Sequence, residues 1–317
     1  MITRPPTGTP QSGPVSDFPF RGLAVALVTP LTAHDEVDHE ALARHAAWVV
    51  EGGVDVLMPC GTTGEGATLT EEEQRGVVAT CLEAVGDRVP VVAGAAANAT
   101  AAACRLARGA RAEGAHGILS VTPYYNKPSQ EGLFRHFSEV AEAGEGVPVI
   151  LYNVPGRTSV NLAPETVLRL AELEAVAGIK ESSGNVGQVM TLLRDRPPGF
   201  GVLAGDDDLA LALVALGADG LVSVAANEVP GPVAELIRAA LEGRLVEARA
   251  IHYRLLPLFR ANFVDTNPVP VKAALELMGR MSAHLRLPLT PLAEEGETVL
   301  RQALALAGAL DGTDHDE

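Results

Sequence analysis

Eight short apolar segments recur along the chain, and helical stretches lie between them. Each segment is apolar throughout rather than alternating, as expected of a parallel strand that is covered on both faces. Most neighbouring segments start roughly 25–35 residues apart, which is the length of one strand–helix unit. The segments span residues 22–29, 54–59, 89–94, 116–121, 147–152, 175–180, 201–205 and 219–224. Eight such units predict an α/β fold of the (β/α)8 type, a TIM barrel.

A doubly wound parallel sheet is the alternative fold. It is disfavoured because no GxGxxG motif follows the first segment and because eight consecutive units close naturally into a barrel. The strand–helix units end near residue 243, and helical patterns follow at 245–260, 269–280 and 292–308. We therefore expect a barrel over residues 18–243 and a C-terminal helical extension over 244–310 that packs on it.

The first 17 residues are rich in Pro, Thr, Gly and Ser. They lack the apolar stretch of a signal peptide, and they cannot bury enough surface to become ordered on their own. We predict a disordered N-terminal tail over residues 1–17.

Several helix boundaries are marked in the sequence. Thr70 followed by Glu73 is the pattern of a capping box, and a glycine such as Gly86 follows a helical pattern as a C-terminal glycine does. The acidic run Asp206–Asp208 opens another helical pattern, where acidic side chains cap backbone amides and complement the helix dipole. We expect capping there rather than metal binding.

The composition limits the partners and the compartment. A formal net charge of −16 repels nucleic acid and anionic membrane surfaces, and no apolar run is long enough to span a bilayer. The three cysteines show no CxxC spacing, so we expect no disulfide and a cytoplasmic protein. The histidines show no helical ligand-pair spacing and none accompanies the strand ends, so we expect no metal site and interpret the histidines as structural or surface residues. The residues concerned are Cys60, Cys81, Cys104, His34, His39 and His45.

Polar residues gather where the predicted strands end, and in a barrel of this kind the loops after the strands carry the chemistry. Six loops therefore converge on one rim, where we place the functional site. The stretches are Gly61–Glu65, Pro123–Pro128, Tyr152–Arg157, Lys180–Glu181, Gly205–Asp208 and Ser223–Asn227.

Lys180 is the sharpest single feature of this rim. It closes the apolar segment AVAGIK, so its ammonium would point into a barrel mouth with little water, and burial of an ammonium favours the neutral amine. A neutral amine can attack a ketone and form an imine, which then serves as an electron sink. The structural alternative is a lysine that leaves the strand end to pair with Glu181 or Asp206.

Three other groups would surround this lysine. Arg157 follows a Pro–Gly turn, and its planar guanidinium suits a substrate carboxylate, although a surface ion pair is its ordinary use. Tyr152 ends the neighbouring segment, where a phenol can shuttle protons or simply satisfy a buried hydroxyl. Thr62 and Thr63 can offer hydroxyls and backbone N–H groups to a carboxylate, or form an ordinary turn.

Five motifs in the chain resemble the dihydrodipicolinate synthase branch of the pyruvate-dependent class I aldolases, which belong to the N-acetylneuraminate lyase family. The motifs are GTTGE, TPYYNKPSQEGL, LYNVPGRT, GIKESSGN and NPVPVK (267–272), and the likeness runs from about residue 20 to 300. The resemblance implies a (β/α)8 barrel with a C-terminal helical region, assembled as a homotetramer from two tight dimers.

On the pyruvate side, the resemblance implies that Lys180 forms a Schiff base with pyruvate while Thr62 and Thr63 hold the pyruvate carboxylate. Gly205 and the backbone near Val222 would line the pyruvate pocket.

The resemblance also implies how protons and the second substrate are handled. Tyr152 would be the proton donor and acceptor at the imine, and Thr63 with Tyr125 would complete a hydroxyl relay to solvent, Tyr125 coming from the adjacent subunit. Arg157 would guide L-aspartate semialdehyde through its carboxylate.

The implied reaction condenses pyruvate with L-aspartate semialdehyde to 4-hydroxy-tetrahydrodipicolinate, a step of lysine and diaminopimelate biosynthesis that needs no cofactor or metal. Relatives that cleave sialic acids or dehydrate sugar acids share the lysine and the tyrosine but typically lack an arginine at the position of Arg157. Another pyruvate-dependent aldolase or a sugar-acid dehydratase stays the alternative function, and a non-catalytic keto-acid sensor is a further one.

Two positions depart from the family pattern near the site. Ala225 stands where related sequences often have a hydroxyl residue, and Gly66 stands where many have Ser or Ala. These departures affect the details of the pocket.

A third departure concerns regulation. Family members inhibited by lysine hold the ligand's amine with a carboxylate four residues beyond Asn98, and here that position is Ala102. Glu71 and Gln74 also stand where sensitive enzymes often have His. We expect weak or absent inhibition by lysine, although Asn98 and Tyr124 are retained.

Overall fold

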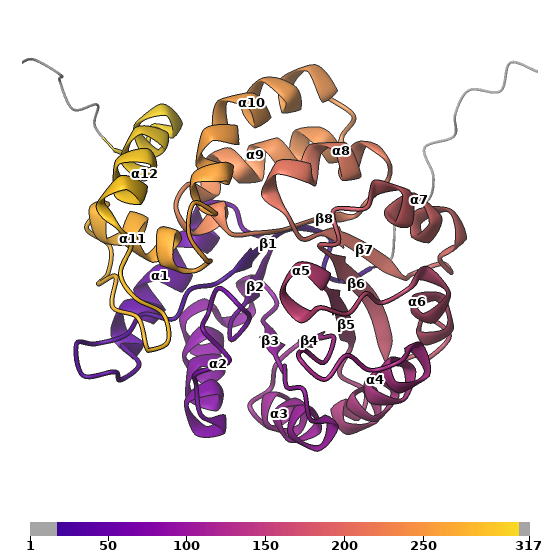
Figure 1. Ribbon diagram of the computed structural model, residues 1–317. Helices are drawn as coiled ribbons and strands as arrows, with labels where there is room; N and C mark the ends of the chain where they lie inside the picture. Colours follow the sequence, from indigo (N-terminus) through magenta and orange to yellow (C-terminus); the bar gives the residue numbers. More distant parts are fainter. Residues whose placement is uncertain (1–17, 311–317) are drawn as a thin grey trace, which may run out of the picture.

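The computed structural model describes residues 18–310, and a ring of helices surrounds its central strands (Figure 1). All strand pairs are parallel, in the order β2-β1-β8-β7-β6-β5-β4-β3, and a bridge between Leu57 and Val91 brings β2 beside β3 and closes the barrel. The strands are β1 (Gly22–Ala26), β2 (Val56–Met58), β3 (Val92–Gly94), β4 (Gly117–Val121), β5 (Val149–Asn153), β6 (Val176–Glu181), β7 (Gly201–Ala204) and β8 (Gly220–Ser223). The predicted (β/α)8 barrel is confirmed, and the prediction for residues 1–17 lies outside the described residues.

Helices connect successive strands and pack on the outside of the barrel. They are α1 (His39–Glu51), α2 (Glu71–Val85), α3 (Thr100–Ala112), α4 (Gln130–Gly144), α5 (Pro155–Thr158), α6 (Pro164–Leu170), α7 (Val186–Asp195), α8 (Ala210–Ala215) and α9 (Pro230–Leu241). Short 3-10 turns lie at η1 (Gly86–Arg88), η2 (Asp207–Leu209) and η3 (Ala225–Asn227).

Alternation along each strand divides the apolar residues into two cores, because successive side chains point to opposite faces. On β5, Val149 and Leu151 pack against the helices, whereas Ile150 and Tyr152 belong to the cluster inside the barrel. On β6, Ile179 packs outward, so the adjacent Lys180 lies on the inner face.

The closed end of the barrel is filled by two aromatic residues that precede β1. Phe18 and Phe20 meet edge to face with ring centroids 5.7 Å apart. A Cβ at Gly178 or Gly201 would stand 3.0 Å or 2.4 Å from the Phe18 ring, so these glycines leave the space that the ring occupies. The opposite end of the barrel is left for polar side chains.

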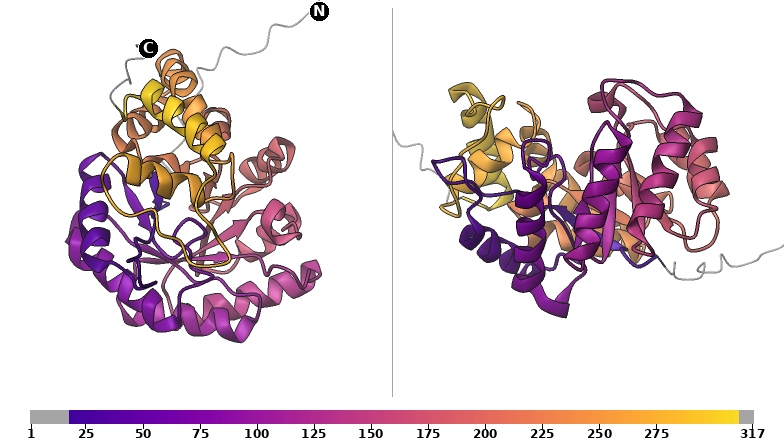
Figure 2. Two further views of the ribbon diagram at one scale, coloured as in Figure 1. Left: turned by 60° about the vertical axis from the view of Figure 1, so that its left-hand side comes forward. Right: turned by 90° about the horizontal axis from the view of Figure 1, so that it is seen from below.

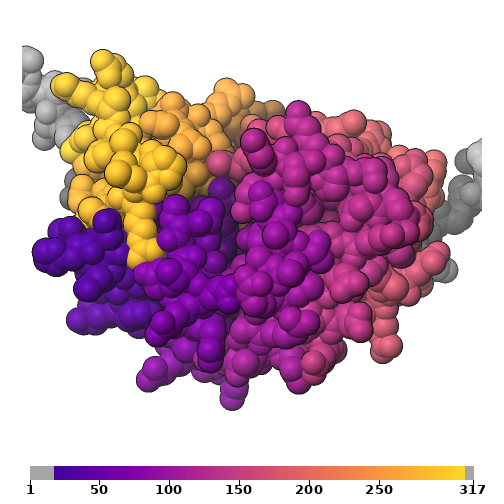
Figure 3. Space-filling model, turned by 60° about the horizontal axis from the view of Figure 1, so that its bottom comes forward, coloured from indigo at the N-terminus to yellow at the C-terminus, as the bar shows by residue number. Residues whose placement is uncertain are grey.

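The chain ends in three helices at the positions the sequence predicted, α10 (Leu245–Ala261), α11 (Val269–Leu277) and α12 (Glu294–Ala307). They lie together on one side of the barrel, in orange and yellow (Figure 2), and the C-terminal segment reaches over the N-terminal strand–helix units (Figure 3). Val271 and Leu275 of α11 pack with Val28 and Val224, which follow β1 and β8. In the described part of the chain, no helix is long and apolar enough to cross a membrane.

The predicted helix caps had mixed outcomes. Thr70 and Glu73 form both hydrogen bonds of the capping box of α2, as predicted. The capping prediction for the acidic run is wrong, because Asp206 makes no side-chain cap bond and Asp207 turns away from its own helix. The Asp207 carboxylate accepts hydrogen bonds from the Ser223 hydroxyl and from the Val224 N–H at 2.9 Å, and so ties the end of β7 to the end of β8.

Candidate active site

Lys180 and Tyr152 are direct neighbours across the β6–β5 pair. The Lys180 Nζ lies 4.3 Å from the centroid of the Tyr152 ring, and Lys180 is only 5 % exposed. Among the described residues no carboxylate comes within 4 Å of this ammonium, so the ion-pair alternative for Lys180 is wrong. The amine is buried beside a phenol, an arrangement that suits imine chemistry.

Glu181 is held by a separate hydrogen-bond network. Its carboxylate accepts from Asn153 Nδ2 at 3.1 Å, from Gln188 Nε2 at 3.0 Å and from the Ser183 N–H at 2.6 Å. Asn153 also accepts from the Leu162 N–H at 2.9 Å. This network locks the ends of β5 and β6, and therefore fixes the residues immediately before them, Tyr152 and Lys180.

Gly205 packs directly against Lys180. A Cβ built at this position would stand 3.0 Å from Lys180 Cε and 1.8 Å from Ser182 Oγ. The Ser182 hydroxyl is buried without a hydrogen-bond partner in the described residues. The absence of a side chain at Gly205 therefore makes room for both groups.

Two acidic residues after β7 shape the charge near Lys180. Burial raises the pKa of Asp206 to about 6, and the nearby positive charge of Lys180 opposes that rise. Burial also raises the pKa of Asp207, although the hydrogen bonds from Ser223 and Val224 counteract it. The charge of Asp206 close to Lys180 therefore depends on pH near 6.

A cavity of about 300 Å³ opens beside this region, large enough for a small-molecule substrate. Thr62 and Arg157 line it, together with Val154 and Asn267. Val154 belongs to the same apolar cluster as Tyr152. Arg157 has no ion pair in the described residues, and its Nη2 donates only a long bond, 3.4 Å, to the Asn267 carbonyl. The guanidinium is therefore free to receive an anion.

Thr63 is placed differently from Thr62. It is buried, and its Oγ1 accepts a hydrogen bond of 2.9 Å from Asn267 Nδ2. Val222 lies inside the barrel in the same apolar cluster as Tyr152. The structure thus brings together Lys180, Tyr152, Gly205 and Val222 inside the barrel, with Thr62, Thr63 and Arg157 at or beside the cavity.

Tyr125 is the one predicted site residue that this arrangement does not include. It is 88 % exposed and has a left-handed backbone with φ of 74°. Its neighbour Tyr124 lines the cavity instead. Tyr125 therefore does not line the cavity.

A buried ion pair joins the first site loop to α11. Lys272 Nζ lies 2.6 Å from the Glu65 carboxylate and also donates to the Thr29 carbonyl at 3.1 Å. Both side chains are almost fully buried. Burial lowers the pKa of Lys272, and the charge and hydrogen bond of Glu65 oppose that fall. The sequence interpretation found the NPVPVK motif but assigned it no physical role, and it missed Asn267, Lys272 and Ser182.

The two departures from the family pattern have different structural settings. At Gly66 a Cβ would stand 2.2 Å from the Cys60 carbonyl oxygen, so this backbone accepts only glycine there. Ala225 is fully buried, and its N–H faces the Asp207 carboxylate at 3.4 Å. A hydroxyl at residue 225 is therefore not needed to satisfy Asp207, which already bonds Ser223.

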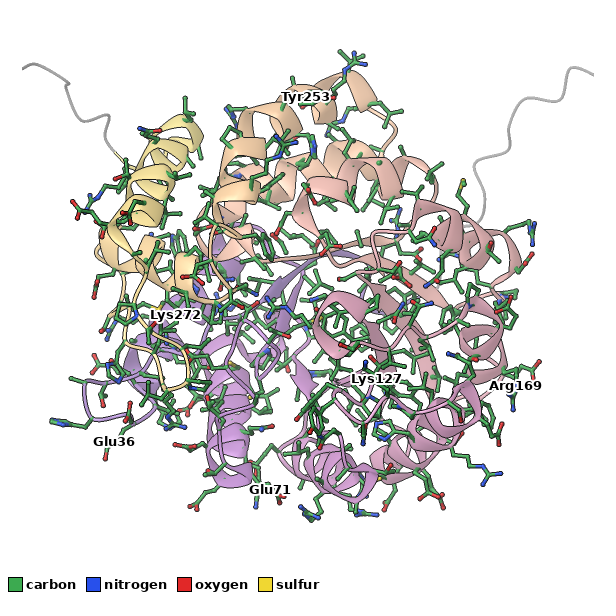
Figure 4. The ribbon with its side chains drawn as sticks, viewed as in Figure 1. Glu36, Glu71, Lys127, Arg169, Tyr253 and Lys272 are labelled. Carbon is green, nitrogen blue, oxygen red and sulfur yellow. The ribbon has the colours of Figure 1, made fainter. Side chains whose placement is uncertain are left out.

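The chain contains only three lysines, and each has a different environment. Lys127 is exposed and has a left-handed backbone, Lys272 is locked to Glu65, and Lys180 is buried beside Tyr152. Lys127 and Lys272 lie on different sides of the barrel mouth in Figure 4. Any covalent adduct on lysine can thus be assigned without ambiguity. In the described residues no group of His, Cys, Asp and Glu is arranged to hold a metal ion.

Comparisons with known proteins agree with this geometry. The model of the Dihydrodipicolinate synthetase family matches residues 19–307. The chain is 49 % identical over 297 residues to a 4-hydroxy-tetrahydrodipicolinate synthase of Prosthecochloris aestuarii, covering 93 % of this chain and 100 % of that relative. It is similar to the crystal structure of dihydrodipicolinate synthase from Aquifex aeolicus, with a TM-score of 0.89, 44 % identity and coverage of 92 % and 99 % of the two chains. It is equally similar in structure to a variant described as the first monomeric dihydrodipicolinate synthase, with a TM-score of 0.89, 41 % identity and coverage of 92 % and 98 %.

Proposed function

The chain belongs to the Dihydrodipicolinate synthetase family, and we propose that it condenses pyruvate with L-aspartate semialdehyde through a Schiff base on Lys180. The enzyme is a lyase of the class I aldolase type, a 4-hydroxy-tetrahydrodipicolinate synthase in lysine and diaminopimelate biosynthesis. The observation that carries the roles of its residues is the buried Lys180 Nζ above the Tyr152 ring, beside a cavity with an unpaired guanidinium.

In the first half of the reaction, Lys180 Nζ attacks the keto carbon of pyruvate and water leaves, which gives an imine. Loss of a methyl proton then gives an enamine, since the imine accepts the electron pair. Tyr152 supports this step because its ring lies against the amine, within reach of groups bound to it. Gly205 provides room around Lys180 Cε, Val222 packs beside Tyr152, and the Thr62–Thr63 turn holds the pyruvate carboxylate.

In the second half, the enamine carbon attacks the aldehyde carbon, and the aldehyde oxygen takes up a proton to become a hydroxyl. The amino group of the adduct then attacks the imine carbon and displaces Lys180, which closes the ring of 4-hydroxy-tetrahydrodipicolinate. Arg157 suits the carboxylate of the aldehyde substrate because it lines the cavity without an ion-pair partner among the described residues. Every step is supplied by side chains, so we propose that the reaction uses no cofactor or metal.

The exposure of Tyr125 supports an active site that depends on assembly. A tyrosine that is 88 % exposed in one subunit is available to a neighbouring one, where it would join Thr63 and Tyr152 in a hydroxyl relay to solvent. We propose a homotetramer of two tight dimers, which sedimentation velocity tests directly. The three cysteines are unpaired, which favours a reducing compartment such as the cytoplasm.

The test is a coupled assay in which the next enzyme of the lysine pathway reduces the product and consumes reduced nicotinamide cofactor. Wild-type protein with pyruvate and aspartate semialdehyde should give activity, Lys180→Ala should abolish it, and Lys127→Ala is the matched control that should keep it. Borohydride with pyruvate should add a stable mass to the peptide that contains Lys180 alone. Turnover of another aldehyde but not of aspartate semialdehyde would instead favour a different pyruvate-dependent aldolase.

A further inference from the structure

The NPVPVK motif, residues 267–272, runs into α11 and is joined to the first site loop by two separate links. Asn267 Nδ2 donates to Thr63 Oγ1 at 2.9 Å, and Lys272 Nζ pairs with Glu65 at 2.6 Å. Thr63 and Glu65 are two residues apart, and Asn267 and Lys272 are five residues apart. The first link is neutral and directional, whereas the second is charged and anchors the same two segments to each other.

The direction of the first link constrains the Thr63 hydroxyl. A hydroxyl has one proton to donate and two lone pairs that accept. Asn267 Nδ2 has no lone pair to offer, so the bond at 2.9 Å uses one lone pair of Thr63. One proton and one lone pair are left, and these are the two functions that a relay between two tyrosines needs.

We propose that Asn267 is a positioning residue that directs the Thr63 hydroxyl, so that Thr63 can accept a proton from one tyrosine while donating its own to the other. This inference rests on the proposed function, in which Thr63 relays protons between Tyr152 and Tyr125. The reversed amide would accept the only proton of Thr63, leave it two lone pairs, and stop the relay.

The surroundings of Asn267 fit a role in positioning better than a role in stability. Asn267 is 94 % buried, since its exposed fraction is 6 %, and its Oδ1 has no hydrogen-bond partner in the described residues. A buried oxygen without a partner costs free energy. The donor bond to Thr63 is therefore the side-chain hydrogen bond that Asn267 makes within the described residues. Its backbone carbonyl also accepts from Arg157 at 3.4 Å, so one residue contacts both the relay and the carboxylate-binding group.

The Glu65–Lys272 pair keeps this contact in register. It fixes the position of the site loop against α11, and Glu65 accepts a further bond from the Arg286 N–H at 3.3 Å. The ion pair does not contact the Thr63 hydroxyl, so it does not determine which way a proton moves through that hydroxyl. The two links therefore predict different effects when each is removed.

The test reverses the polarity of the directional link. Asn267→Asp has nearly the same shape, but its carboxylate only accepts, so it would hold the Thr63 proton, whereas Asn267→Ala removes the bond and leaves the hydroxyl free. The assay is exchange of the pyruvate methyl protons with deuterium from D2O, followed by NMR, which reports enamine formation without the second substrate. At pH 8 we expect exchange to fall about 100-fold in Asn267→Asp, the lower end of what general acid–base catalysis contributes. In Asn267→Ala, where the hydroxyl can still turn to the correct direction, we expect a smaller fall of about 10-fold, below that range.

The pH profile provides a readout that a merely structural role would not change. As the pH is lowered, the introduced carboxyl takes up a proton and can donate again, so exchange by Asn267→Asp should recover relative to Asn267→Ala. The charged groups near this position include the Arg157 guanidinium, the Glu65–Lys272 pair and Arg286, and Asp265 lies two residues earlier in the chain. Both variants keep all of them. Equal exchange by the two variants at every pH, or faster exchange by Asn267→Asp at pH 8, would overturn the proposal.

Two controls complete the experiment. In a Thr63→Val background the Asp and Ala variants should exchange equally, because no hydroxyl is left to direct, and a persistent difference would also contradict the proposal. The Glu65→Gln/Lys272→Met double variant, which loses the anchoring ion pair and the bond to the Thr29 carbonyl but keeps Asn267, should show no recovery at low pH. Failure of the proposed function is recognised separately, since the wild type would then exchange pyruvate protons without consuming aspartate semialdehyde in the coupled assay.

Discussion

Lys272→Met should be among the most destabilising single substitutions in this protein. Methionine has a similar length and fills the same space, but it leaves the Glu65 carboxylate, 1 % exposed at its side chain, without its ammonium 2.6 Å away. Removing one partner of a buried ion pair costs about 3–5 kcal/mol, because the other charge stays buried without compensation. The Thr29 carbonyl also loses the donor at 3.1 Å.

The double variant Glu65→Gln/Lys272→Met isolates the charge from the packing. Both charges are then absent, and the Gln oxygen still accepts from the Arg286 N–H. Replacement of a buried pair by uncharged groups of similar volume is often close to neutral, so we expect the free energy of unfolding to stay within about 1 kcal/mol of the wild-type value. Urea unfolding at one fixed protein concentration, read by circular dichroism, measures all three proteins.

The loss of stability in Lys272→Met should depend on pH. In Lys272→Met the penalty belongs to the ionised Glu65 carboxylate, which has lost its counter-charge, so the penalty is present at high pH and is relieved in acid. The single variant should therefore approach the double variant in mildly acidic buffer. A single variant as stable as the wild type at pH 8, or a double variant as unstable as the single one, would refute the reasoning.

Four further predictions follow from the site. Gly205→Ala should slow borohydride trapping of pyruvate about 10- to 100-fold, because its Cβ would stand 3.0 Å from Lys180 Cε and small displacements of a reacting group are costly. Adding Ser182→Ala to the same chain should restore part of the rate. An unchanged trapping rate in Gly205→Ala would contradict the packing argument. Arg157→Leu should raise the KM for aspartate semialdehyde while pyruvate trapping continues, as steady-state kinetics would show. Asp206→Asn should be more stable than the wild type by roughly 1–3 kcal/mol above pH 6 and equally stable near pH 4. Burial raises the pKa of Asp206 to about 6, so the wild type loses stability as the pH rises through that range, whereas the Asn variant does not. Lysine at submillimolar concentration should leave the initial rate unchanged because residue 102 is Ala, and inhibition there would sink that prediction.

The sequence predicted the barrel and the rim of the site because both depend on local patterns. Continuous apolar segments at regular spacing specify parallel strands, and the last residue of a strand is placed by the strand itself. Lys180 and Tyr152 were therefore predicted as neighbours, and they are paired in the β5–β6 register. The helices at 245–260, 269–280 and 292–308 were equally visible, and they are α10, α11 and α12.

The contacts that hold the site together could not be predicted in the same way, because their partners lie far apart in the chain. Thr63 and Asn267 are separated by 204 residues, and Glu65 and Lys272 by 207. The prediction that the Asp206–Asp208 run caps a helix was wrong for the same reason. A local cap is the usual role of such a residue, whereas the partner of Asp207, Ser223, lies on the next strand.

We propose that the C-terminal region contributes to the chemistry through contacts that the barrel alone does not supply. A barrel can present Lys180 and Tyr152 from adjacent strands without help, but it cannot fix the rotation of a hydroxyl on a loop, because a loop hydroxyl turns to whatever partner is near. The fold places an amide donor from residue 267 against Thr63 and then anchors that segment with a buried ion pair five residues later. Loss of the Asn267–Thr63 bond should therefore slow proton transfer before it prevents imine formation, because Lys180 and Tyr152 belong to the barrel, whereas Asn267 lies just before α11.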